Sequence, residues 1–277
     1  MVSWAGVRVA RGAGTVADPC AGRPGRRGTM TAVPDAPDRP DTALTDPVTS
    51  ALRGRLAGFG ATRGAAVRFD PEVSPFAALP LDADGHGSAG DWADLAALCA
   101  PGSEVVVVRA AAGPPRIPAG WELLRAFPGV QMDGAAVPGA AADGLVELGP
   151  SDRAEMAELA GRTRPGPWLA RTAELGRYLG VRHDGRLVAM AGERMRIGGA
   201  GGAGATEISA VCTDPEFRGR GLARRLVDAV AAGIVARGER PVLHAAADNL
   251  GAIRLYGAMG FTLSRTMRFD LLRAPHR

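Results

Sequence analysis

The sequence contains no lysine, so arginine carries every positive side-chain charge other than that of histidine. Aromatic residues make up only 5% of the chain, too few for the interleaved basic and aromatic surface that binds single-stranded nucleic acid. The formal charge of +4 is mild, and the arginines are spread along the chain. These features predict no nucleic-acid partner.

Cysteines and long apolar segments are also scarce. Cys20, Cys99 and Cys212 are odd in number and far apart, which argues against a disulfide framework or a metal site. No segment approaches the roughly 18 apolar residues that cross a bilayer. Arg8 and Arg11 interrupt the start of the chain, where a signal peptide needs an apolar core. We therefore predict a cytoplasmic protein with reduced thiols, no metal and no membrane contact.

Composition divides the chain into a tail and two folded regions. Residues 1–46 are rich in Gly, Pro, Asp and Arg without hydrophobic periodicity, so we expect a disordered tail. Met30, within that tail, is a second candidate for the start of translation. Residues 47–142 are expected to form an N-terminal α/β region without a catalytic constellation. Its predicted elements are helices over 48–56 and 92–99 and strands over 65–69 and 104–109.

Residues 143–277 have the pattern of a mixed α+β sheet with six or seven strands. Apolar segments predict the strands, and the Asp184-Gly185 turn predicts a β-hairpin. The predicted strands cover 145–148, 181–183, 187–196, 207–213, 242–246 and 261–271. The predicted helices cover 151–162, 171–179, 221–236 and 250–259.

A turn rich in glycine and arginine joins the predicted strand over 207–213 to the helix over 221–236. It reads Arg218-Gly-Arg-Gly-Leu-Ala-Arg224. Glycines let backbone N–H groups approach a phosphate, and the helix start adds partial positive charge. A P-loop would need a lysine, which the chain lacks, and a dinucleotide fingerprint would need glycine where Arg224 stands. The turn therefore predicts another phosphate compound.

Two segments together identify that compound by resemblance. The turn is similar to the acetyl-CoA loop of the GCN5-related N-acetyltransferase (GNAT) family, (Gln/Arg)-x-x-Gly-x-(Gly/Ala), with Arg218, Gly221 and Ala223 at its fixed places. The segment from Asn249 to Phe261 matches the family pattern Asn-x-x-Ala-x-x-x-Tyr-x-x-x-Gly-Phe. One helix and one strand separate the two segments, as in the family.

Three shorter segments are similar to the FR47-like branch of that family, which often carries an extra N-terminal region. They are Tyr178-Leu-Gly-Val, Ala191-Gly-Glu-Arg and Leu243-His-Ala. The resemblance covers about residues 145–269 and implies a GNAT-type acyl-CoA N-acyltransferase fold. Residues 47–142 are then an added region, and one hypothesis is that they form a degenerate GNAT-like half.

The resemblance implies an acetyl-CoA-dependent N-acetyltransferase that moves an acetyl group to an amine directly, in a ternary complex. Acetyl-CoA is then a co-substrate, and no metal is required. A second hypothesis is a non-catalytic acyl-CoA sensor or structural module. Thiol release from acetyl-CoA across a panel of amines separates the two.

The same resemblance implies which residues bind CoA. Backbone N–H groups near Gly219 to Arg224 bind the pyrophosphate, while the edge of the strand over 211–213 and Asn249 bind the pantetheine arm. The predicted set is Val211, Cys212, Thr213, Arg218, Gly219, Arg220, Gly221, Leu222, Ala223, Arg224 and Asn249.

Tyr256 occupies the family's general-acid position, where a phenol protonates the departing thiolate. The general base stays open between Glu207, His244 and Glu193, in that order of preference, and a water relay is a further alternative.

The acceptor, a small-molecule or peptide amine, is expected between the loop over 164–171 and the hairpin tip over 198–204. Trp168 and Tyr178 are candidates to line that site. We expect the N-terminal region either to close the acceptor side or to form a homodimer.

Overall fold

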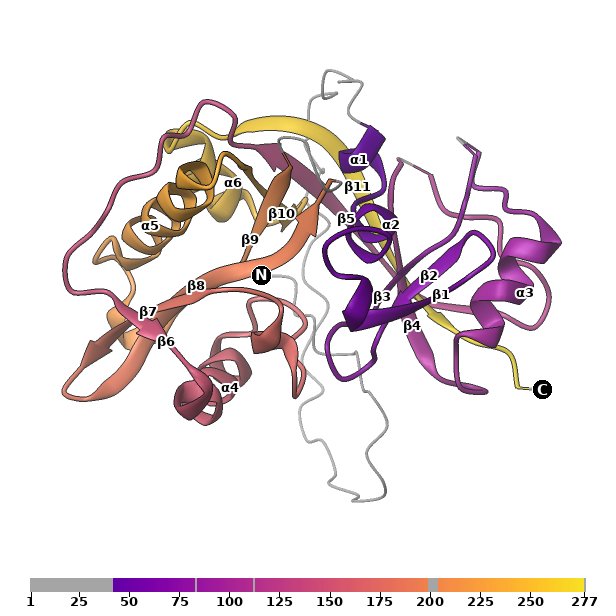
Figure 1. The fold of residues 1–277 in the computed structure, drawn as a ribbon, viewed down its shortest axis with the longest axis horizontal. Coiled ribbons are helices and arrows are strands. Elements are labelled where there is room, and N and C mark those ends of the chain that lie inside the picture. Colours follow the sequence, from indigo (N-terminus) through magenta and orange to yellow (C-terminus); the bar gives the residue numbers. More distant parts are fainter. Residues whose placement is uncertain (1–41, 83, 112, 199–203, 277) are drawn as a thin grey trace, which may run out of the picture.

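The computed structural model describes residues 42–82, 84–111, 113–198 and 204–276, whose strands form one mixed sheet (Figure 1). The strands are β1 (Gly60–Arg63), β2 (Ala66–Phe69), β3 (Phe76–Ala78), β4 (Glu104–Ala110), β5 (Glu122–Asp133), β6 (Val146–Leu148), β7 (Tyr178–His183), β8 (Arg186–Ile197), β9 (Ala205–Thr213), β10 (Arg240–Ala246) and β11 (Thr262–Arg273). Their order across the sheet is β1-β2-β3-β4-β11-β5-β10-β9-β8-β7-β6. The mixed α+β class is confirmed.

All six strands predicted within residues 143–277 are present as β6 to β11, but their sheet has eleven strands because β1 to β5 of the N-terminal region join it. Helices pack on this sheet. They are α1 (Thr42–Thr45), α2 (Pro47–Leu52), α3 (Ala89–Ala97), α4 (Arg153–Thr163), α5 (Leu222–Ala236) and α6 (Leu250–Ala258). Most predicted elements appear within about four residues of their expected bounds.

The described residues begin inside the predicted tail, at α1. Leu44 is buried in the core, and Asp46 caps α2 by accepting a hydrogen bond from the backbone N–H of Thr49 at 3.0 Å. Cys20 and Met30 lie outside the described residues. Residues 42–46, which the sequence assigns to the tail, therefore belong to the folded part of the chain.

The predicted helix over 171–179 is wrong. A short 3₁₀ turn covers Thr172–Glu174, and β7 already begins at Tyr178. Backbone groups of this segment bond to the N-terminal region instead: the N–H of Arg171 donates to Glu72 at 2.9 Å. Gly176 packs so closely on Glu193 that a Cβ would lie 2.6 Å from the Glu193 Cβ. These tertiary contacts override the helical pattern.

Strand β5 was not predicted, yet it is central. It pairs antiparallel with β10 on one side and with β11 on the other. Pro128 lies within it, where β10 has reached its last paired residue, Ala246. The Pro128 carbonyl accepts from Ala247, so its missing N–H faces the side on which β10 ends. The proline thus leaves the pairing with β11 intact.

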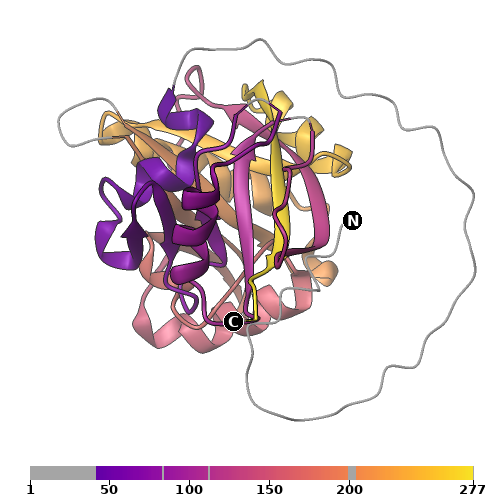
Figure 2. The ribbon, with the colours of Figure 1, turned by 90° about the vertical axis from the view of Figure 1, so that its right-hand side faces the viewer.

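The order of strands repeats between the two halves. The series β1-β2-β3-β4 matches β7-β8-β9-β10, since β3 and β4 are parallel around α3 as β9 and β10 are parallel around α5. Each half then sends its last strand into the other: β5 pairs with β10, and β11 pairs with β4. Figure 2 shows β11 (yellow) running between two strands of the N-terminal half.

Apolar cores cover both faces of the sheet. On one face α5 and α6 bury a cluster that includes Leu226, Val230 and Tyr256 (Figure 1). On the other face α1 and α2 pack over strands from both halves, including Phe269 of β11. The face opposite α5 and α6 therefore combines residues from both regions of the chain.

Candidate functional site

Strands β9 and β10 separate halfway along their length. Their pairing runs from Ala205 opposite Arg240 to Ile208 opposite Leu243 and ends there. Ala210 lies in the left-handed region, with φ 52°, where β8 and β9 shift register. Such a bulge bends the strand away from its neighbour. A cavity of about 1240 Å³ fills the opening and continues onto both faces of the sheet.

The turn after β9 leaves a run of backbone N–H groups available at one end of this cavity. Gly219 and Gly221 have φ values of 76° and 72°, which favour glycine. Helix α5 follows without a side-chain cap and without an acidic residue in its first turn. From Gly219 to Arg224, no backbone N–H donates to any described residue. We call residues 219–224 the cradle; it has the features of an anion site.

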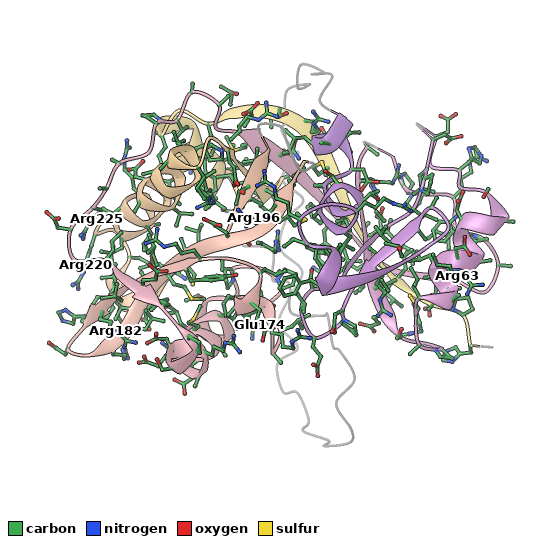
Figure 3. The ribbon with its side chains drawn as sticks, in the orientation of Figure 1. Arg63, Glu174, Arg182, Arg196, Arg220 and Arg225 are labelled. Atoms are coloured by element: carbon green, nitrogen blue, oxygen red, sulfur yellow. The ribbon has the colours of Figure 1, made fainter. Side chains whose placement is uncertain are left out.

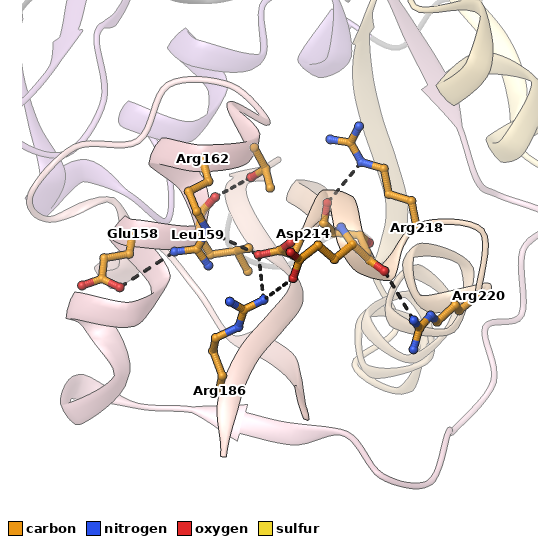
Figure 4. Close-up of polar contacts among 10 residues, drawn as sticks. Glu158, Leu159, Arg162, Arg186, Asp214, Arg218 and Arg220 are labelled. Carbon is orange, nitrogen blue, oxygen red and sulfur yellow. Dashed lines mark hydrogen bonds and ion pairs between the residues drawn. The ribbon is translucent and has the colours of Figure 1, made fainter. Parts of the chain in front are cut away.

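Salt bridges hold the turn that precedes the cradle (Figure 4). Asp214 lies 3.4 Å from the Nε of Arg162 on α4 and 3.3 Å from Arg186 on β8. Arg186 also lies 3.3 Å from Glu216, so both carboxylates before the cradle are matched by arginine. The paired arginines therefore offset the negative charge of Asp214 and Glu216, which would otherwise repel an anion at the cradle.

Four arginines lie in or next to the cradle, and two of them, Arg218 and Arg224, line the cavity. Arg218 donates to the carbonyl of Thr213 at 3.4 Å, and Arg224 lies 3.7 Å from Asp228. Arg220 is outside the cavity lining and stacks 4.8 Å from the centre of the Phe217 ring. Figure 3 shows Arg220 and Arg225 together at the start of α5. Every other predicted CoA-binding residue lines the cavity.

Tyr256 of α6 reaches the cavity from the helical face. Its side chain is 8% exposed, and its hydroxyl has no hydrogen-bond partner among the described residues. Burial, with a smaller contribution from Cys212, raises the pKa of Tyr256 to about 12, so the phenol keeps its proton at neutral pH. Asn249 caps α6 by accepting from Ala252 at 3.2 Å, which leaves its amide N–H groups for a ligand.

A buried hydrogen-bond network on the opposite face connects side chains from four strands, β5, β8, β9 and β10. Arg194 of β8 holds both carboxylate oxygens of Glu207, at 2.8 and 2.5 Å, and Nδ1 of His244 lies 2.8 Å from Glu207. Burial alone would raise the pKa of Glu207, but Arg194 and His244 lower it to about 2. Gln131 of β5 contacts Nε2 of His244 at 3.1 Å and donates to the carbonyl of Leu44.

These partners define the roles open to each candidate base. Glu207 is outside the cavity lining, and both its oxygens are occupied, so it orients His244 rather than meeting a substrate. His244 lines the cavity, and donation from its Nδ1–H to Glu207 leaves Nε2 as the proton acceptor. Glu193 pairs with Arg237 at 2.9 Å, outside the cavity. The geometry thus favours His244 over Glu207 and Glu193.

Beyond His244 the cavity reaches strands β5 and β11, and residues 164–167 of the loop predicted at the acceptor site also line it. Trp168 and Tyr178 are outside the cavity lining and pack on each other, with ring centroids 5.5 Å apart. The predicted hairpin tip over 198–204 falls largely outside the described residues. At the start of this tip, the backbone N–H of Gly198 donates to the hydroxyl of Ser50 at 2.9 Å. This end of the hairpin therefore faces α2.

Cys212 lines the cavity beside Tyr256, but it is a poor nucleophile. Burial raises the pKa of its thiol to about 11, so the thiolate is scarce at neutral pH. Cys99 and Cys212 are free thiols. Within residues 42–276, apart from the gaps named above, no three His, Cys, Asp or Glu side chains gather as metal ligands. No helix in the same residues is long and apolar enough to cross a membrane.

Comparisons with known proteins agree with this geometry. The FR47-like protein family model matches residues 178–269, which include the cradle and Tyr256. A crystal structure from Novosphingobium aromaticivorans DSM 12444, whose description assigns it to the GNAT family of acetyltransferases, is 42% identical. It superposes with a TM-score of 0.73 and covers 84% of this chain and 98% of that one. No curated protein matches the sequence.

Two further structures share the fold at lower identity. A GCN5-related N-acetyltransferase from Kribbella flavida is 18% identical, and a GCN5-related N-acetyltransferase-like protein from Streptococcus suis 89/1591 is 15% identical. Each has a TM-score of 0.51 and covers 84% of this chain and 94% of its own. The mixed sheet with its separated strand pair therefore defines a GNAT-type acyltransferase fold. The chain belongs to the GNAT family of acyltransferases, in its FR47-like branch.

Proposed function

We propose that the protein transfers an acetyl group from acetyl-CoA to an amine, directly and within a ternary complex. One observation carries the proposal: a single cavity joins the cradle, the free edge of β9, Tyr256 and His244. An acyl-CoA phosphate site, a proton donor and a proton acceptor thus face one space. The predicted homodimer and the cytoplasmic location stay predictions.

The cavity fits an acyl-CoA. The N–H groups of the cradle are suited to the pyrophosphate, with the α5 dipole and Arg218 assisting. The edge of β9 from Val211 to Thr213 is unpaired on its β10 side and suits the amides of the pantetheine arm. The amide N–H groups of Asn249 add a donor on the other side. Bound acetyl-CoA supplies an acyl group already activated as a thioester.

The residues around the cavity supply the two proton transfers. The acceptor ammonium replaces the Gln131 amide at Nε2 of His244 and gives up a proton there. Glu207 stabilises the resulting imidazolium through Nδ1, and Arg194 keeps Glu207 ionised. The carbon–nitrogen bond forms, the carbon–sulfur bond breaks, Tyr256 gives its proton to the sulfur, and the nitrogen releases its second proton to solvent. Solvent then returns a proton to Tyr256 and removes one from His244.

Tyr256→Phe tests this assignment, and the other tyrosine of the chain provides the control. We expect kcat to fall by roughly 100-fold or more with acetyl-CoA affinity unchanged, because only the proton donor is lost. Tyr178→Phe removes a buried hydroxyl that has no hydrogen-bond partner among the described residues, and it should leave kcat unaltered. An unchanged kcat in Tyr256→Phe would remove Tyr256 from the mechanism.

One observation favours a non-catalytic acyl-CoA sensor as the second candidate. The Gln131 amide contacts Nε2 of His244, so in this conformation that nitrogen is not free to accept a proton from a substrate. Thiol release from acetyl-CoA over a broad amine panel decides between the candidates. Binding of acetyl-CoA with no release above the hydrolysis rate would establish the sensor.

We also propose that residues 47–142 are a degenerate GNAT-like half. Support comes from the repeated strand order and from the parallel pair β3 and β4 around α3. This half supplies β5, and with it Gln131 and Phe127, to the acceptor side. Its role is therefore to close the acceptor side rather than to bind a second acyl-CoA.

A further inference from the structure

The acceptor end of the cavity lies beyond His244, on the face opposite α5 and α6. Three strands contribute partly aromatic lining: Arg125 and Phe127 of β5, Arg194 of β8, and Thr266 and Phe269 of β11. The loop over 163–167 lines the same cavity. Phe127 and Phe269 are paired neighbours, and the Phe269 ring lies 5.9 Å from the His244 ring. An apolar surface therefore leads from His244 toward Arg125.

Arg125 carries a charge that the surrounding protein does not match. It is exposed, and it forms no ion pair or hydrogen bond with the described part of the chain. Its guanidinium carbon lies 4.7 Å from the centre of the Phe127 ring, a contact that directs the group along the aromatic surface. Arg194, by contrast, is neutralised by Glu207 at 2.5 Å.

Acidic groups are scarce around the same space. Asp248 is the one carboxylate in the lining formed by described residues, and it lies beside Asn249 at the start of α6, with the acyl-CoA residues. Glu207 is buried behind His244 and held by Arg194. A purely cationic acceptor such as a polyamine would meet an unmatched arginine and no free carboxylate.

We infer that Arg125 binds a carboxylate of the acceptor, so that the preferred substrates are amines that also carry a carboxylate. The inference rests on the proposed transferase function and adds the class of acceptor. The guanidinium offers a planar fork that matches a carboxylate in two hydrogen bonds. Phe127 and Phe269 then lie beneath the carbon chain that separates the carboxylate from the reacting amine at His244.

The test is steady-state acetyl transfer to matched pairs of acceptors. A series of linear amino acids of increasing length is compared with the primary amide of each, together with a polyamine and a phosphorylated amine. Wild type should prefer each productive amino acid over its amide by roughly 10- to 100-fold in kcat/KM. Arg125→Gln should abolish the preference by raising KM for the amino acid, with KM for acetyl-CoA unchanged.

Two further variants complete the design. Arg125→Lys keeps the charge without the fork and should retain part of the preference. Arg116→Gln removes an exposed arginine outside the cavity lining and should behave as wild type. A preference for amides or for the polyamine, a preference for the phosphorylated amine, or an Arg125→Gln enzyme that still prefers carboxylates would each overturn the inference. Absence of transfer to every acceptor would instead refute the proposed function.

Discussion

The segment from β9 through α5 to β10 and the segment from β3 through α3 to β4 have the same topology but opposite chemistry where their helices begin. At α5 the N–H groups of the cradle are open, and arginines surround them. At α3, Ser88 accepts from the N–H of Asp91 at 3.0 Å and donates to its carboxylate at 2.6 Å. The second helix start is therefore closed by its own side chains.

The loop before α3 is also acidic and internally bonded. Asp82 accepts from the N–H of His86 at 2.8 Å, and Asp84 adds a further negative charge. A Cβ on Gly87 would lie 2.9 Å from the Trp92 indole nitrogen, so the backbone there is already packed. A phosphate would meet carboxylates and find few free donors. The comparison shows that the strand–helix–strand unit provides the place for a phosphate, and the residues at the helix start decide whether one binds.

The N-terminal half nevertheless contributes to the site through its last strand. β5 lies between β10 and β11 and brings Gln131 to His244 and Arg125 to the acceptor end. The half without a cradle thus shapes the acceptor side of the half that has one. The largest predicted effect follows from this exchange of strands.

A fragment of residues 143–277 tests the comparison, because it removes the N-terminal half together with β5. Without β5, both β10 and β11 lose an antiparallel partner in the middle of the sheet. We expect no soluble, cooperatively folded monomer, as judged by circular dichroism and size-exclusion chromatography. Residues 42–142 supplied as a separate chain should restore folding. A fragment that alone keeps full stability and activity would contradict the role assigned to β5.

The next prediction concerns stability and compares one ion pair from each half, Arg194–Glu207 and Arg63–Asp94. Arg194→Met leaves Glu207 buried without its main partner and should cost about 3–5 kcal/mol in the free energy of unfolding. Arg63, labelled in Figure 3, pairs with Asp94 on the exposed surface of the N-terminal half. Arg63→Met breaks this pair and should cost at most about 1 kcal/mol. Urea denaturation of both variants measures the difference. Equal losses would show that the Arg194–Glu207 pair behaves as a surface pair.

The same pair predicts a pH dependence. The pKa of Glu207 is about 2 in the folded protein, compared with 4.5 for an unperturbed glutamate side chain. The unfolded chain therefore binds a proton first as the pH falls. The stabilisation by Glu207 is complete above pH 4.5 and is lost as the pH falls toward 2. Arg194→Met should shift this loss to higher pH.

A smaller effect sharpens the contrast between the two helix starts. Arg224 is the third residue of α5, the place that Asp91 takes in α3. Arg224→Asp gives the cradle the charge of its counterpart and should weaken acetyl-CoA binding by roughly tenfold to 100-fold in calorimetry. Arg225→Asp makes the same charge change outside the cavity lining and should have a much smaller effect. Equal losses in both variants would assign the effect to long-range charge.

Much of the phosphate side of the site was predictable from local sequence. The glycines at 219 and 221 and the helix that follows are neighbours in the chain, so their spacing alone indicates a cradle. Asn249 and Tyr256 share one helix with a fixed period. These four residues line one cavity, as does every predicted CoA-binding residue except Arg220.

The acceptor side was not predictable, because it depends on pairing between distant segments. Pro128 and Gly129 interrupt the apolar pattern of β5, so no strand was expected there. Arg125 and Phe127 were missed with it. Alternation of Val130 and Met132 with polar neighbours was the one local signal for this strand. Likewise, the role of Glu207 depends on Arg194 from the adjacent strand, which spacing along the chain does not reveal.

Hydrogen exchange with and without acetyl-CoA tests the central claim most directly, because it reads the backbone N–H groups that distinguish the two units. Acetyl-CoA should slow exchange over residues 211–224, where the cradle and the β9 edge have unbonded N–H groups. Exchange over residues 84–91, at the start of α3, should not change. Protection at 84–91, or none at 211–224 under saturating acetyl-CoA, would contradict the account.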